Sequence, residues 1–283
     1  MLTLFGLLAR LPLWLLHAVG APGGWLTFLL SPTYRRRFID NAAQAGYTFA
    51  DVAGAVGQAG RMALETPRLW SGRTSPIEWR DLECLEAALQ SGRGVLFLTP
   101  HLGCYEVTAQ AVAARYMTAQ QPLTVLYRPA RKAWLSGVMQ SARQRPELVA
   151  APTTLAGVRQ LIRALRQGAA VGLLPDQVPP EGMGQWTSWF GKPAYTITLS
   201  ARLALQTGAT LVLVFGERLS WGRGYRLHFR PLSRPLAPNL DAALLQINEA
   251  VEALIRECPQ QYLWGYGRYK QPRRVAAVAP AAS

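Results

Sequence analysis

The sequence predicts an α/β fold in which a mixed central sheet is flanked by helices. Short apolar runs recur after residue 80, and each is long enough for one buried strand. Helical patterns separate these runs, so strands and helices alternate along the chain. With 283 residues, of which 50% are hydrophobic, the chain can bury a full core. No Ser/Gly-rich linker divides the sequence, which favours one large domain.

Four of the apolar runs are expected to be buried strands. They are "GVLFL" at 94–98, "LTVLY" at 123–127, "AVGLL" at 170–174 and "TLVLVF" at 210–215. A fifth run, "YRLHFRPL" at 225–232, alternates in polarity, which predicts a strand at the edge of the sheet. Helices are expected at 104–116, 133–143, 154–167, 197–207 and 241–257.

The N-terminal segment stands apart because residues 11–34 contain no Asp, Glu, Lys or Arg. A run of this length could cross a bilayer, which takes about 20 apolar residues. Pro12 and the "APGG" at 21–24 are expected to break it up, so an embedded hairpin, a helix in the interface and a buried pair of core helices all stay open. Three arginines follow at 35–37, and the positive-inside rule places them on the cytoplasmic side. Residues 1–34 are interpreted as a membrane-associating segment.

Residues 35–274 are expected to form the main domain, and the Ala/Pro-rich tail at 275–283 is expected to be disordered. Thirty Lys and Arg against sixteen Asp and Glu give a formal charge of +14 and a pI near 10.4, which indicates an anionic partner. Nucleic acid is disfavoured because no recognised nucleic-acid motif occurs. The three cysteines match neither a zinc pattern nor a disulfide framework, which favours a reduced, cytosol-facing compartment.

Polar residues follow three of the predicted strands. His101 and Glu106 come after the first, Arg128 after the second, and Asp176 with Gln177 after the third. Ligands of open α/β sheets bind at the carboxyl ends of the strands. We therefore expect these side chains to converge on a binding site.

The pair of His101 and Glu106 indicates general base chemistry. On one helix, side chains five residues apart point about 140° away from each other, so His101 must lie on the turn before the helix. Pro100 supports this, because the residue before a proline is extended. Glu106 could then reach back and orient the imidazole, as in a hydrolytic triad without an obvious serine. A substrate hydroxyl would supply the nucleophile, and His101 would remove its proton.

Alternatives to this interpretation stay open. A His and a Glu at this spacing also occur together by chance. Cys104 offers a different chemistry, that of a Cys–His nucleophile in a thioesterase or hydrolase, although a small buried cysteine is the commoner fate. His17 and His228 are expected to be structural.

The segment "HLGCYE" at 101–106 resembles the H-x-x-x-x-E motif of the bacterial lipid A biosynthesis acyltransferases, the late lauroyl and myristoyl transferases. These enzymes belong with the wider glycerolipid acyltransferases. Further segments resemble the family in the same order and cover most of residues 30–272. They are "VLYRP", "GLLPDQ", "WFGKPAYT" and "PQQYLWGYGRYK".

The resemblance implies a glycerol-3-phosphate acyltransferase-like fold and direct acyl transfer from an acyl carrier protein thioester to a hydroxyl of a lipid A precursor. It also implies that no metal or other cofactor takes part, and that the catalytic domain faces the cytoplasm at the inner membrane. Another glycolipid, such as a phosphatidylinositol mannoside, is the alternative acceptor. A lipid-binding protein without activity is a third possibility.

The resemblance also assigns roles to residues. His101 becomes the general base and Glu106 its partner, and substrate binding falls to Arg128, Asp176, Gln177 and Lys192. The chain departs from the family at Val178, where some relatives have a second acid. It departs again at residues 266–268, where Tyr-Gly-Arg replaces a common His-Arg-Arg run, which puts contacts from the C-terminus in doubt.

A basic stripe is expected on the helix at 154–167. Arg159, Arg163 and Arg166 are spaced i, i+4 and i+7, so they share one face. Such a stripe is often only a solvated surface. It would also suit docking of the acidic acyl carrier protein that the resemblance implies.

Overall fold

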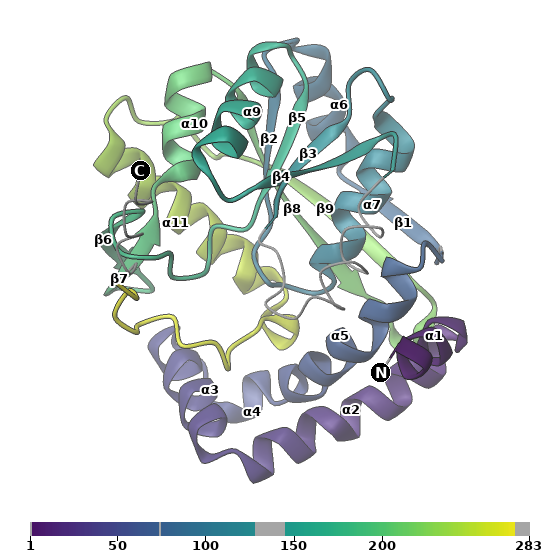
Figure 1. Cartoon of the computed structure of the whole chain (residues 1–283). Coiled ribbons are helices and arrows are strands. Elements are labelled where there is room, and N and C mark those ends of the chain that lie inside the picture. The colour runs from purple at the N-terminus through teal and green to yellow at the C-terminus, as the bar shows by residue number, and fades with distance from the viewer. Residues whose placement is uncertain (1, 74, 128–144, 275–283) are drawn as a thin grey trace, which may run out of the picture.

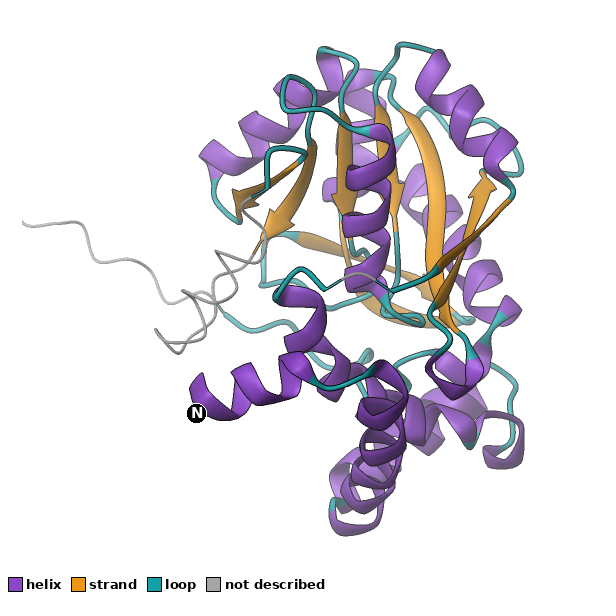
Figure 2. Cartoon of the chain, turned by 90° about the vertical axis from the view of Figure 1, so that its right-hand side faces the viewer, coloured by secondary structure: helices purple, strands orange, loops and turns teal. Residues whose placement is uncertain are grey.

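The computed structural model describes residues 2–73, 75–127 and 145–274 and has a mixed seven-stranded sheet at its centre (Figure 1). The strand order is β1-β9-β8-β2-β5-β3-β4, and all neighbouring pairs are parallel except β8 and β9. Helices cover both faces of the sheet (Figure 2). The predicted α/β class with a mixed sheet is therefore confirmed.

The strands of the sheet are β1 (Ile77–Arg80), β2 (Val95–Leu98), β3 (Leu123–Tyr127), β4 (Leu148–Pro152), β5 (Ala170–Leu173), β8 (Thr210–Arg218) and β9 (Tyr225–Pro231). A separate antiparallel hairpin consists of β6 (Gly184–Trp189) and β7 (Lys192–Ile197). The helices before the site are α1 (Leu2–Arg10), α2 (Leu13–Leu30), α3 (Pro32–Gln44), α4 (Phe49–Val52), α5 (Gly54–Trp70) and α6 (Leu82–Gln90). Those after it are α7 (Tyr105–Tyr116), α9 (Leu155–Arg166), α10 (Leu199–Thr207), α11 (Leu240–Glu257) and the short 3-10 turns η1 (Ser220–Gly222) and η2 (Pro259–Gln261).

The core lies on both sides of the sheet because side chains of a strand alternate between its faces. In β2, Leu96 and Leu98 belong to one buried cluster, whereas Val95 and Phe97 belong to the other. All four side chains are buried, as expected for a central strand with helices on both faces.

One predicted strand has a different position in the sheet from the one expected. The run at 225–232 forms β9, but β9 is not an edge strand, because it pairs with β8 on one side and with β1 on the other. The sequence IEWR of β1 is only four residues long and was not recognised as a strand, so its pairing with β9 was missed. The expected helix at 133–143 and the expected tail at 275–283 lie outside the described residues.

The N-terminal segment also differs from its expectation, because α2 continues as one helix through Pro22 and its glycines. The glycines serve helix packing instead. A Cβ at Gly24 would lie 2.2 Å from the carbonyl oxygen of Val56, and a Cβ at Gly60 would lie 1.9 Å from that of Gly20. Only glycine lets the backbones of α2 and α5 approach so closely.

A buried polar network joins these two helices to the sheet. The carboxylate of Glu65 on α5 accepts hydrogen bonds from Arg218 on β8, at 2.8 Å from Nε and 2.6 Å from Nη2. Its other oxygen lies 2.8 Å from Nε2 of His17 and 3.0 Å from the hydroxyl of Tyr225. The four side chains are almost fully buried. His17 therefore has a structural contact, as expected.

Removing the Glu65 charge is expected to destabilise the fold. Burial alone would raise the pKa of Glu65, but the Arg218 charge and the hydrogen bonds outweigh it and lower the pKa to about 2. The stabilisation is therefore complete above pH 4.5 and is lost as the pH falls from there towards 2. Glu65→Gln should lower the free energy of unfolding at pH 7 by about 3 kcal/mol, because it leaves Arg218 buried without its counter-charge.

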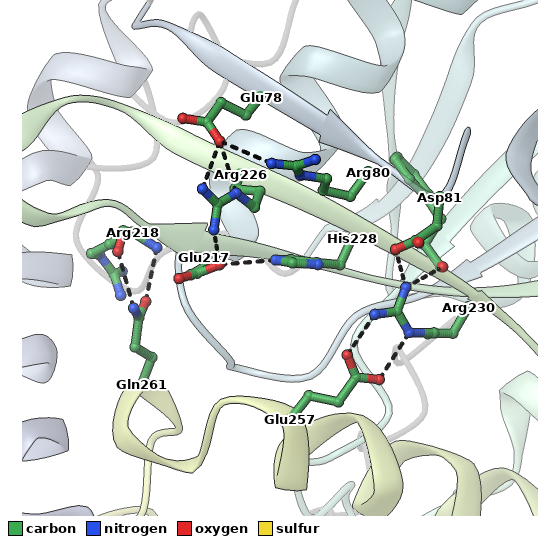
Figure 3. A network of polar contacts seen from close by, with 11 residues as sticks. Glu78, Arg80, Asp81, Glu217, Arg218, Arg226, His228, Arg230, Glu257 and Gln261 are labelled. Carbon is green, nitrogen blue, oxygen red and sulfur yellow. Dashed lines mark hydrogen bonds and ion pairs between the residues drawn. The ribbon is translucent and has the colours of Figure 1, made fainter.

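Chemical denaturation measures this loss, and Glu78→Gln is the matched control. Glu78 also pairs with an arginine, at 2.7 Å from Arg226, but in an exposed network on β1, β8 and β9 (Figure 3). An exposed pair contributes at most about 1 kcal/mol. Equal losses in the two variants would contradict the role given to the Glu65 network.

Candidate active site

His101 lies on the turn between β2 and α7, as the sequence predicts. This turn is tied down on two sides. The amide of Cys104 donates to the carbonyl of Gly216 on β8 (2.7 Å), and the amide of Leu263 donates to the carbonyl of His101 (3.1 Å). Gly103 has a φ of 58°, and a Cβ there would lie 2.1 Å from the Gly216 oxygen, so glycine is required at this approach.

The carboxylate that orients His101 belongs to Asp176, which follows β5. Its Oδ1 lies 2.8 Å from Nδ1 of the imidazole, and its Oδ2 accepts from the His101 backbone amide at 2.9 Å. Both strands that carry these residues lie side by side at the centre of the sheet. The sequence predicts Glu106 as the partner of the imidazole. The structure adds Asp176 as a carboxylate in contact with the ring, and the role of Glu106 stays a prediction.

The second ring nitrogen of His101 faces Gln177. The amide nitrogen of Gln177 lies 3.0 Å from Nε2. Since the carboxylate of Asp176 can only accept, the Nδ1 proton is on the Asp176 side, and Nε2 accepts from the amide. The imidazole therefore presents a lone pair at Nε2, which is the form that a general base needs.

Asp176 is ionised even though its side chain is buried. Burial alone would raise the pKa of Asp176, but the electrostatic interaction with His101 and the two hydrogen bonds from that residue outweigh it, and the pKa lies below its ordinary value. The charge of Arg268 also contributes. A buried anion at this position stabilises an imidazolium ion as it forms.

The C-terminal segment supplies the cation behind this pair. Arg268 is 2% exposed, and its guanidinium donates to the carbonyl of Tyr195 (2.9 Å) and to the hydroxyl of Thr196 (2.5 Å). The hydroxyl of Tyr266 accepts from the amide of Val178, two residues after Asp176. The departure from the family pattern at residues 266–268 left the contacts of this segment unpredicted. The sequence feature that could have indicated a buried cation is a basic residue among the aromatic residues of "YLWGYGRYK".

An apolar cavity begins beside His101. The ring of Tyr105 packs against the imidazole with centroids 4.7 Å apart, and Tyr105 and Glu106 both line the cavity. Its remaining wall is formed by α7 and by the central strands, with Phe97, Thr99, Thr108, Ala109, Val112, Leu123, Val125, Leu126, Gly172, Leu174 and Val214. The cavity therefore presents an apolar lining close to the catalytic turn.

The other predicted site residues are placed as follows. Arg128 lies outside the described residues. Lys192 begins β7 and its Nζ lies 4.9 Å from the ring centroid of Tyr269, an aromatic contact that leaves its role in substrate binding a prediction. Arg159, Arg163 and Arg166 are all exposed on α9, whereas Leu161 and Leu165 are buried, so the expected stripe is present.

Cys104 is poorly suited to be a nucleophile. Its side chain is 2% exposed. Burial, followed by the negative charge of Glu65, raises the pKa of the thiol well above its ordinary value. The thiol is therefore protonated at neutral pH, whereas the thiolate is the reactive form.

Comparisons with known proteins show which proteins this chain is similar to. A family model described as bacterial lipid A biosynthesis acyltransferase matches residues 45–271. The lipid A biosynthesis palmitoleoyltransferase of Escherichia coli (strain K12) is 27% identical over 216 residues, which cover 75% of this chain and 68% of the relative. The lipid A biosynthesis acyltransferase 2 of Shigella flexneri is 24% identical over 238 residues, 83% of this chain and 71% of the relative. The lipid A biosynthesis lauroyltransferase of Escherichia coli (strain K12) is 28% identical over 180 residues, 62% of this chain and 55% of the relative.

Proposed function

This chain belongs to the bacterial lipid A biosynthesis acyltransferase family and is an acyltransferase, and we propose that it moves a fatty acyl chain from an acyl carrier protein thioester to a hydroxyl of a lipid A precursor. The observation that carries the proposal is the hydrogen bond of 2.8 Å between His101 and the buried carboxylate of Asp176. The further proposal is a glycerol-3-phosphate acyltransferase-like fold, held at the inner membrane with its site on the cytoplasmic side.

The proposed reaction uses the acceptor hydroxyl as nucleophile. His101 Nε2 removes the hydroxyl proton as the oxygen attacks the thioester carbonyl, and Asp176 stabilises the imidazolium. The tetrahedral intermediate then collapses, the carbon–sulfur bond breaks, and the imidazolium returns the proton to the leaving thiolate. The Gln177 amide occupies Nε2 in the structure, so it must give up this hydrogen bond when the hydroxyl binds.

Glu106, Arg128 and Lys192 are proposed to act on the substrates rather than on the imidazole. Glu106 lines the cavity beside Tyr105, close to the reacting carbonyl in this scheme. Arg128 and Lys192 carry the positive charge that a phosphorylated glycolipid requires.

The acyl chain is proposed to occupy the cavity beneath α7. Gly172 on β5 lines this cavity, and a Cβ there would lie 3.2 Å from Cγ1 of Val125. Gly172→Val should therefore shorten the space and shift the preferred donor to shorter chains. Each excluded methylene should change the ratio of kcat/KM values for two chain lengths by about fourfold, from about 0.8 kcal/mol per buried CH2.

Competition between acyl carrier protein thioesters of different length measures this shift. A Gly→Val control at Gly208 would be strained, because the backbone there has a φ of 70°, which favours glycine. Val158→Ala on α9 is a better one, since this half-buried residue is not part of the cavity lining. An unchanged chain preference in a folded Gly172→Val protein would contradict the placement of the acyl chain.

The basic stripe on α9 is proposed to dock the acidic acyl carrier protein. Its three arginines are exposed, so charge reversal should leave the core intact. Replacing Arg159, Arg163 and Arg166 by Glu should raise the KM for carrier-bound donors, and added salt should mimic this by screening. A small acyl-pantetheine donor should be nearly unaffected. If the KM rises equally for both donors, the carrier docks elsewhere.

Mass spectrometry of lipid A from cells that lack this protein tests the proposed function. We expect lipid A that lacks one acyl chain, restored by the intact gene and not by a His101→Ala gene. Unchanged lipid A together with a change in another glycolipid would assign the enzyme to that acceptor instead.

A further inference from the structure

The helix α2 exposes an apolar face that nothing in the described chain covers. Its large exposed side chains are Trp14, Val19, Trp25, Leu26, Leu29 and Leu30. Leu30 is 72% exposed and Trp14 is 58% exposed. In Figure 1, α2 lies at the border of the helical layer that faces away from the sheet. Monomeric soluble proteins rarely expose an apolar stripe of this length without a partner.

The opposite side of α2 is packed against the protein from one end to the other. Its buried residues are Leu13, Leu16, His17, Gly20, Gly24 and Phe28. Although α2 is long and apolar enough to cross a membrane, this side is held against α5, which carries Arg61, Glu65 and Arg68. Crossing a bilayer would take these charged groups into hydrocarbon or break the contact. The packing therefore favours a helix that lies along a surface.

A second element reaches the same surface from the sheet. The turn η1 between β8 and β9 carries Trp221, whose side chain is 89% exposed. The next residue, Gly222, lies directly against α2, because a Cβ there would be 2.4 Å from the backbone nitrogen of Trp14. Trp221 also has a φ of 60°, a left-handed conformation that costs an aromatic residue roughly 1–2 kcal/mol. In water, burial of the Trp221 side chain does not offset this cost, because the side chain is exposed.

Arginines lie beyond both ends of this face. Arg10 and Arg223 are exposed near the N-terminal end of α2, and Arg36 and Arg37 are exposed beyond its C-terminal end. Residues 1–39 contain no Asp or Glu. An apolar face between groups of arginines complements a bilayer with anionic headgroups, with tryptophan at the headgroup level.

We propose that the exposed face of α2 and the side chain of Trp221 form one membrane-binding surface, on which the protein lies in the plane of an anionic bilayer without crossing it. The proposal deepens the membrane association included in the proposed function. It gives the sheet domain its own contact with the lipid, through η1. The helix α5, on which α2 packs, contacts α7 and shares the Glu65 network with β8.

Vesicle flotation of the full chain tests the contribution of Trp221. With vesicles of phosphatidylethanolamine and phosphatidylglycerol, Trp221→Ala should weaken binding about tenfold, which corresponds to about 1.4 kcal/mol. Trp186→Ala is the matched control, because Trp186 is an exposed tryptophan on the β6–β7 hairpin. Lipids with brominated acyl chains should quench the fluorescence of the parent and of Trp186→Ala more than that of Trp221→Ala. Equal binding and equal quenching in all three proteins would overturn the proposal.

Labelling with a membrane-impermeant thiol reagent tests the orientation of α2. Pro12 and Thr33 are exposed at its two ends, and each is replaced by Cys in turn. Vesicle-bound protein should be labelled at both positions, above the background of the unmodified chain. Protection of one end only would show a spanning helix and overturn the in-plane arrangement.

Self-association of the parent without vesicles, lost in Trp221→Ala, would assign the surface to a second copy of the chain. Binding and labelling need no acyl transfer, so they fail or succeed independently of the proposed reaction.

Discussion

Replacing His101 by alanine is expected to lower the rate of acyl transfer by about 10²–10⁴-fold, the usual contribution of a general base. The imidazole is the group whose Nε2 lone pair faces the site, and its loss leaves the acceptor hydroxyl without a proton acceptor. The half-buried His101 side chain lies on a turn rather than in the core, so the variant should fold. The measurement is the release of carrier thiol in parallel with formation of the acylated lipid.

Cys104→Ala is the matched control for His101→Ala, because both residues belong to the same turn. It should keep most of the activity, since the buried thiol is protonated and the acceptor supplies the nucleophile. An inactive Cys104→Ala protein, together with an acyl-cysteine that can be trapped on the parent, would overturn the mechanism.

Asp176→Asn is expected to reduce acyl transfer by about 10²-fold or more while the protein stays folded. The two oxygens of Asp176 accept from the Nδ1–H and from the backbone amide of His101. An asparagine has one acceptor oxygen, so one donor loses its partner or the imidazole takes the wrong tautomer. The charge that stabilises the imidazolium is lost as well. The rate of acyl transfer as a function of pH measures both effects.

Glu217→Gln provides the control for Asp176→Asn. Glu217 on β8 also contacts a histidine, at 2.9 Å from Nε2 of His228 on β9, but within the described chain this carboxylate makes no hydrogen bond or ion pair with the imidazole of His101 (Figure 3). Its activity should be close to that of the parent. Glu106→Gln separates the two carboxylates: full activity in Asp176→Asn with a large loss in Glu106→Gln would return the orienting role to Glu106.

The sequence predicted the central strands well because each is a short apolar run between turn residues. β2, β3, β5, β8 and β9 all lie where they were expected. The four residues of β1 carry no comparable signal, and without β1 the position of β9 in the sheet could not be found. The continuity of α2 was also hidden, because a glycine that breaks an isolated helix can instead serve close packing against another helix, here α5.

The sequence placed His101 and Asp176 at one edge of the sheet but did not predict the contact between them. The rule that ligands bind at the carboxyl ends of strands brought His101 and Asp176 to one edge of the sheet. Which carboxylate orients the imidazole depends on two turns that are 75 residues apart in sequence. Local spacing favours Glu106, five residues away, whereas the contact with Asp176 depends on the neighbouring positions of β2 and β5. The buried Arg268 behind Asp176 depends on the path of the C-terminal segment, which periodicity does not specify.

Acyl transfer by His101 and Asp176 is tested in a single reaction with purified protein, an acyl carrier protein thioester and a lipid A precursor. We expect one added acyl chain on the lipid for each carrier thiol released, no free fatty acid and no acylated protein. We also expect His101→Ala and Asp176→Asn both to slow this transfer. Release of free fatty acid without an acylated lipid, or equal transfer by these two variants and the parent, would contradict the proposed reaction.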